Sequence, residues 1–101
     1  MVDLEVDISR VRYRTFGDLD TTIDRMCSAN DLTITMKSTL SKYPGSIHWH
    51  VKRGQDPGTL EVTLWPAQER LWFSVQAGRT ADWVMQTAHR FRDQLETRST
   101  D

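Results

Sequence analysis

Cysteine is nearly absent from this chain of 101 residues, and other features that would narrow its function are missing too. The one cysteine, Cys27, has no partner for an internal disulfide and cannot form a zinc site made of cysteines. We expect Cys27, which lies in an apolar stripe, to be an unreactive part of the core. The sequence has no nucleophile motif and no glycine-rich phosphate loop, which favours a non-enzymatic protein.

Long apolar runs and a strong net charge are also missing. No apolar run approaches the roughly 20 residues of a membrane helix, and the first ten residues lack the pattern of a secretory signal. A net charge of −1 gives no overall attraction to nucleic acid or to an anionic membrane. These absences favour a cytoplasmic protein, with one domain over residues 1–96 and a polar tail over residues 97–101.

Two segments have the apolar spacing of amphipathic helices. The first is predicted over residues 18–29, with Asp18 as its N-cap and Asn30 as its stop. The second follows Gly78, which ends a strand, and has Thr80 as its N-cap. The two apolar stripes consist of Leu19, Ile23, Met26 and Cys27 in the first helix and of Val84, Ala88, Phe91 and Leu95 in the second.

Between the helices, four segments alternate apolar and polar residues, which predicts four antiparallel strands. The apolar positions expected on one face are Leu32, Ile34, Met36, Ile47, Trp49, Val51, Leu60, Val62, Leu64, Leu71, Phe73 and Val75. Residues 3–8 are either a further strand, bulged near Ser9, or a lead-in to a short strand over residues 10–15. The predicted fold is α+β: a two-layer sandwich of order (β)-α-β-β-β-β-α, with an antiparallel meander sheet and both helices packed on one face.

The stretch "LWPAQERLW", residues 64–72, has a tryptophan on either side of a predicted turn. A turn centred on residues 68–69 pairs Trp65 with Trp72 on the sheet face that points away from the helices. An uncovered indole pair exposes an apolar patch of a size that marks interaction sites. Three alternatives stay open: the N-terminal residues fold over the pair, a protein partner binds it, or the pair stacks on a flat ligand.

The same face carries polar side chains that can act as metal ligands. His48 and His50 lie two residues apart on one strand, and a turn centred on residues 55–56 places Glu61 opposite His50. Two imidazoles and one carboxylate are a donor set that transition metals accept. No fourth ligand is evident, because His89 lies on a helix beyond the other sheet face. Hydrogen-bonded polar sheet residues are therefore the simpler interpretation, and we assign no cofactor.

Arg10, Arg12 and Arg14 alternate in "SRVRYRTF", so an extended chain presents all three on one side. The first predicted helix begins just beyond them, and the free N–H groups at a helix start favour an anion. The arginine row is therefore a candidate anion-binding site. The alternative is that these arginines balance the charge of nearby aspartates.

We expect this protein to be a small interaction module that binds a protein partner, or a second copy as a homodimer, through the sheet face opposite the helices. The side chains expected to make this contact are Trp65, Trp72, His48, His50, Glu61 and Gln76. The first alternative is a metal-dependent or small-ligand-binding protein that uses His48, His50 and Glu61 beside the tryptophans. The second is a single-stranded nucleic-acid binder, which is disfavoured because the face has only Lys37 and Lys52 as fixed positive charges.

Overall fold

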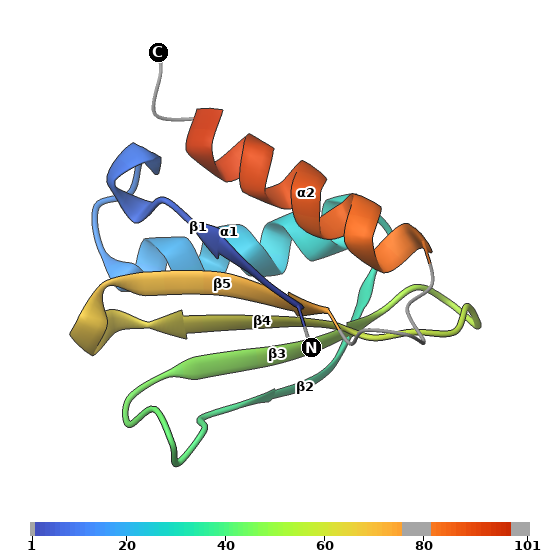
Figure 1. The fold of residues 1–101 in the computed structure, drawn as a ribbon, viewed down its shortest axis with the longest axis horizontal. Helices are drawn as coiled ribbons and strands as arrows, with labels where there is room; N and C mark the ends of the chain where they lie inside the picture. Colours follow the sequence, from blue (N-terminus) through green and yellow to red (C-terminus); the bar gives the residue numbers. More distant parts are fainter. Residues whose placement is uncertain (1, 76–81, 98–101) are drawn as a thin grey trace.

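The computed structural model describes residues 2–75 and 82–97, and two helices pack on one face of a five-stranded sheet (Figure 1). In chain order the elements are β1 (Val2–Val6), the 3-10 helix η1 (Ile8–Arg10), α1 (Phe16–Ala29), β2 (Thr33–Ser38), β3 (Ile47–Lys52), β4 (Leu60–Trp65), the 3-10 helix η2 (Pro66–Gln68), β5 (Arg70–Val75) and α2 (Asp82–Thr97). The sheet is antiparallel, with strand order β1-β5-β4-β3-β2. The predicted α+β sandwich is confirmed. None of the described helices has the length and apolar character needed to cross a membrane.

The N-terminal residues form an edge strand of this sheet. β1 pairs antiparallel with β5, beyond the four-stranded meander. η1 follows at once, and its N-cap Asp7 accepts a hydrogen bond from the Ser9 N–H (3.2 Å). The alternative strand over residues 10–15 is wrong, because this local cap turns the chain where that strand would begin.

Both predicted helices are present, with differences at their ends. α1 begins earlier than predicted, because Thr15 is its N-cap and accepts a hydrogen bond from the Asp18 N–H (3.1 Å). Asp18 is therefore a first-turn residue, where its charge suits the helix dipole, and not the cap. Asn30 is the C-cap, as predicted. The predicted strand break at Gly78 and N-cap at Thr80 lie outside the described residues.

The core lies between the helices and the inner face of the sheet. Both predicted helix stripes are buried, and Trp49 and Phe73 on the sheet are fully buried opposite them. The rings of Phe73 and Phe91 meet edge to face, with centroids 6.3 Å apart, which joins β5 to α2. Trp83 is buried as well, and its indole N–H donates to the Pro57 carbonyl (2.8 Å). Each such buried side chain stabilises the fold by roughly 1.5–3 kcal/mol.

The hairpin between β4 and β5 has a different register from the predicted one. η2 and then Glu69, which has a left-handed backbone (φ 51°), centre the turn one residue earlier. Trp65 consequently lies opposite Arg70, and Trp72 lies opposite Thr63. The predicted direct pairing of the two tryptophans is wrong. This shift moves each residue's partner on the other strand by two positions. Because strand side chains alternate with a period of two, every side chain of β4 and β5 still points to its predicted face.

A β-bulge in β2, just before Met36, reverses the predicted orientation of two residues. Met36 lies opposite His50 on the outer face, the sheet face away from the helices, and is 39% exposed. Lys37 points to the helix side instead, where its Nζ contacts Asp20 (2.7 Å) and Asp24 (3.0 Å) of α1. The predictions of an inward Met36 and an outward Lys37 are therefore both wrong.

Candidate metal centre

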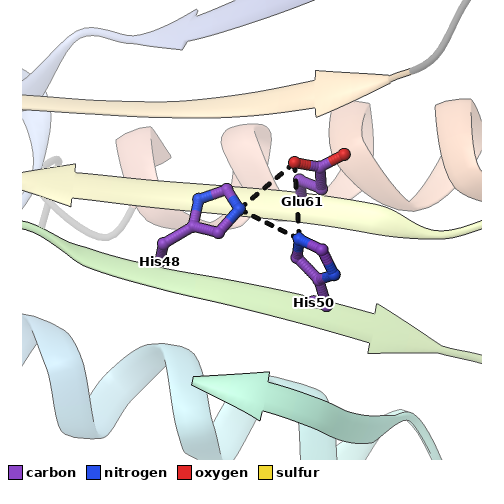
Figure 2. Close-up of side chains that lie close together, drawn as sticks. All are labelled: His48, His50 and Glu61. Carbon is purple, nitrogen blue, oxygen red and sulfur yellow. Dashed lines mark hydrogen bonds and ion pairs between the residues drawn. The ribbon is translucent and has the colours of Figure 1, made fainter. Parts of the chain in front are cut away.

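Two histidines and a glutamate converge on the outer face of the sheet (Figure 2). We call His48, His50 and Glu61 the His–His–Glu group. His48 Nε2 lies 3.1 Å from His50 Nε2 and 3.1 Å from Glu61 Oε1, and the distance from His50 Nε2 to Glu61 Oε1 is 3.6 Å. Within the described residues, no other three histidine, cysteine, aspartate or glutamate side chains bring ligand atoms this close together. The structure thus brings together the three residues that the sequence offered only as an alternative metal-ligand set.

The pairing of β3 with β4 produces this convergence. His50 lies directly opposite Glu61 and His48 opposite Thr63, as the turn between the strands predicted. Opposite residues in an antiparallel pair have Cβ atoms roughly 4.5–5.5 Å apart, and alternate residues of one strand share a face. Gly54 in the connecting turn has a positive φ (53°), a conformation that favours glycine and keeps the connection tight.

The three side chains differ in exposure. The His48 side chain is 6% exposed, whereas His50 is 34% and Glu61 25% exposed. Burial lowers the pKa of the His48 imidazole below its ordinary value, which Glu61 opposes and the nearby His50 reinforces. A lowered pKa keeps His48 neutral near pH 7, and the neutral imidazole is the form that binds a metal ion.

Thr63 orients the buried histidine. Its Oγ1 lies 2.8 Å from His48 Nδ1, and Thr63 is itself buried. The hydroxyl can accept a hydrogen bond from a protonated Nδ1, which leaves the lone pair of Nε2 directed at His50 and Glu61. Such a bond fixes the tautomer and ring orientation of a metal-ligating histidine. The turn that places Glu61 opposite His50 also places Thr63 opposite His48, but the sequence does not reveal this orienting role.

The triangle of ligand atoms has the size that one transition-metal ion requires. Bonds of about 2.0–2.2 Å separate neighbouring ligand atoms by roughly 3.3–3.6 Å in a tetrahedral site and by roughly 2.8–3.1 Å in an octahedral site. The two separations of 3.1 Å lie at the upper end of the octahedral range, and the separation of 3.6 Å lies at the upper end of the tetrahedral range. A bound ion would therefore need a small adjustment of the side chains to reach either geometry. Three ligands from one side leave further coordination positions directed away from the sheet, the arrangement of open metal sites.

The two predicted tryptophans belong to an aromatic cluster with Tyr43, from the loop between β2 and β3. The Tyr43 ring centroid lies 4.8 Å from that of Trp65 and 5.3 Å from that of Trp72. The Trp65 indole N–H donates to the Pro44 carbonyl (3.1 Å), and the Arg70 guanidinium lies 4.4 Å from the Trp72 ring centroid. Trp72 is only 5% exposed as a result. The chain itself therefore covers Trp72, whereas Trp65 and Tyr43 stay partly exposed.

The burial of Trp72 reduces the exposed indole pair, on which the partner-binding hypothesis depended, to a partly exposed Trp65. The alternative in which the N-terminal residues fold over the indoles is wrong, because β1 lies at the sheet edge. A protein partner or a homodimer on the outer face stays a prediction, and Gln76, the last residue expected to contribute, lies outside the described residues. Nothing in the sequence indicated the role of Tyr43, because the contact depends on how the loop between β2 and β3 returns to the end of the sheet where the tryptophans lie.

The arginine row does not form. Arg10 belongs to η1, and its Nη1 lies 3.7 Å from Glu96 Oε1 on α2. Arg12 and Arg14 line a surface depression at the start of α1, together with Tyr13, Asp18 and Thr22. An aspartate therefore lines the depression in which an anion was expected, and anion binding by Arg12 and Arg14 stays an untested prediction.

The outer face has few positive charges with which to bind nucleic acid. Its charged residues on the described strands are Asp3, Glu5, Glu61, Lys52 and Arg70. Arg70 pairs with Glu5, at 2.8 Å between Nη2 and Oε1, and Lys37 lies on the helix side. Single-stranded nucleic-acid binding is therefore less favoured by the structure than by the sequence.

No family model matches this chain, and no curated protein or solved structure matches it. The functional conclusion therefore rests on the geometry of the outer face. That geometry consists of three converging ligand atoms and a buried imidazole whose second nitrogen is hydrogen-bonded.

Proposed function

We propose that this protein binds one divalent transition-metal ion through His48, His50 and Glu61. The observation that carries the proposal is the convergence of their three ligand atoms at 3.1–3.6 Å from one another. Two imidazole nitrogens and a carboxylate oxygen repel each other through their lone pairs unless a proton or a cation lies between them. A single proton links two of these atoms, whereas a metal ion links all three.

The donor set selects the kind of metal. Imidazole nitrogen suits zinc, cobalt, nickel, copper and iron, whereas magnesium and calcium prefer sites made only of oxygen. Two of the three donor atoms here are imidazole nitrogens. We therefore assign the site to zinc and to divalent ions with similar ligand preferences.

Titration calorimetry with Zn²⁺ and with Co²⁺ tests this proposal. We expect one ion per chain, and we expect His50→Ala to weaken binding by about 100-fold or more, because one of three ligands is lost. His50 is the ligand to replace because its side chain is 34% exposed, so its removal leaves the core intact. His89→Ala is the matched control, since His89 is exposed on α2 and should leave the affinity unchanged.

Two results would contradict the proposal. One is equal affinity in the wild-type protein and His50→Ala, because another group would then hold the ion. The other is the lack of stoichiometric binding by Zn²⁺, Co²⁺, Ni²⁺ and Cu²⁺ to protein whose circular dichroism shows a folded state.

A further inference from the structure

The coordination positions that the protein leaves open on the proposed metal ion all point in one direction. The three ligands come from β3 and β4 (Figure 2), on the sheet face that points away from the helices. His50 and Glu61 are 34% and 25% exposed, so solvent reaches this side of the group. A ligand from solution can therefore bind the ion without displacing a protein ligand.

The charge of the loaded site selects the kind of ligand. Glu61 supplies one negative charge and the two histidines bind as neutral imidazoles, so a divalent ion leaves a net charge of +1. Lys52 adds a positive charge on the same face, two residues beyond His50 and roughly 7 Å away along β3. The loaded site is therefore electropositive, which favours an anion over a neutral molecule.

The other acidic residues of this face do not cancel that charge. Asp3 accepts a hydrogen bond from Ser74 (2.9 Å) on β5, and β1 lies two strands from β4, roughly 10 Å away. Glu5 is occupied by Arg70 (2.8 Å). Neither carboxylate belongs to the converging group.

From this geometry, and on the basis of the proposed metal ion, we infer that the loaded site binds a small oxyanion, with an oxygen atom of a carboxylate or a phosphate coordinated directly to the ion. The aromatic cluster bounds the site beyond His48, and Met36 lies opposite His50 on the other side.

Cobalt-loaded protein provides the test, because the visible absorption of Co²⁺ changes when its ligands change. We expect saturable spectral changes with acetate and with inorganic phosphate, and none with acetamide, which matches acetate in size but is neutral. We expect Lys52→Gln to weaken acetate binding by about threefold and to leave Co²⁺ affinity unchanged. Lys42→Gln is the matched control, since Lys42 lies over Tyr43 in the loop that covers the aromatic cluster.

The outcomes separate the two proposals. A spectrum that stays unchanged with both anions, or that responds equally to acetamide, overturns the oxyanion inference and leaves the metal site intact. A saturable response to only one of the anions supports the inference and tells which of the two groups the site takes. Failure of Co²⁺ itself to bind overturns the metal site, and the oxyanion inference with it.

Discussion

The outer face of the sheet has an aromatic end and a polar end, built on the same strands. The aromatic cluster lies under the loop between β2 and β3, and its Trp72 is 5% exposed. The His–His–Glu group lies in the next rows, where His48 is buried but His50 and Glu61 stay 34% and 25% exposed. Both ends looked like interaction surfaces in the sequence. The difference teaches that an apolar patch is readily covered by a neighbouring loop, whereas converging polar groups have a reason to stay accessible.

The largest expected effect is at the aromatic end. We expect Trp72→Ala to lower the free energy of unfolding by about 3–5 kcal/mol, because it empties a buried aromatic site. Glu61→Gln at the polar end should change it by about 1 kcal/mol or less, since Glu61 is partly exposed. Urea denaturation measures both, and Trp72→Phe gives a milder variant if the alanine protein does not fold. If Trp72→Ala and Glu61→Gln lowered the free energy of unfolding equally, the aromatic end would not be the more buried of the two ends.

The next largest effect on stability is expected from Cys27, which is buried on α1 on the other side of the sheet. Burial raises the pKa of its thiol from 9.0 to about 11, and Asp24 contributes to the shift. The unfolded chain therefore loses this proton first, so the stabilisation is complete below pH 9 and is lost as the pH rises towards 11. We expect a loss of up to about 3 kcal/mol over this range.

Thermal or urea denaturation at pH 8, 9, 10 and 11 measures this loss. Cys27→Ala is the control, because it lacks the thiol but keeps the other groups that titrate in this range. The wild-type protein should lose more stability than the variant between pH 9 and 11. Parallel curves for the two proteins would show that the thiol is not held in the interior.

A smaller effect is expected from the residue that links the two ends of the outer face. Thr63 lies opposite Trp72 and bonds His48 Nδ1. We expect Thr63→Val to lower zinc affinity by about tenfold, because the ring of His48 loses its orienting partner. Calorimetry measures the change, with Thr33→Val on β2 as a threonine control that should bind zinc normally. Unchanged affinity in both variants would remove Thr63 from the proposed site.

The smallest effect concerns Arg70, which lies over the ring of Trp72. The Arg70 side chain is 45% exposed, and its guanidinium also pairs with Glu5. We expect Arg70→Gln to lower the free energy of unfolding by about 0.5–1 kcal/mol, the usual range for exposed cation–π and ion-pair contacts. Urea denaturation with tryptophan fluorescence measures it. A loss as large as that of Trp72→Ala would mean that Arg70 is a main element closing the cluster.

Much of the fold followed from periodicity alone. The spacing of Leu19 and Ile23 predicted a helix stripe, and the alternation around Trp49 predicted a strand with that tryptophan inside; the structure confirms both. The bulge before Met36 could not be predicted, because extra residues of this kind follow from the competition between strand pairs and not from local pattern. The turn after Trp65 was misplaced by one residue for a similar reason, since several turn types fit "PAQE".

The candidate site was predictable only in part. His48, His50 and Glu61 could be placed together because a short turn fixes the register and strand side chains alternate. Their ligand atoms meet through side-chain rotamers, which the sequence does not specify. The orienting bond from Thr63 depends on the burial of both partners, and this too is set by packing.

By itself, the sequence determined which residues of β3, β4 and β5 face the helices and which face outward, because period and turn length act locally along the chain; the bulge in β2 reversed this for Met36 and Lys37. Only the tertiary structure decided that the loop containing Tyr43 packs against the tryptophans, and that His50 and Glu61 stay partly exposed while His48 is buried. The physical reason is that covering a surface requires two segments far apart in sequence to pack together, and that choice depends on the free energy of the whole molecule.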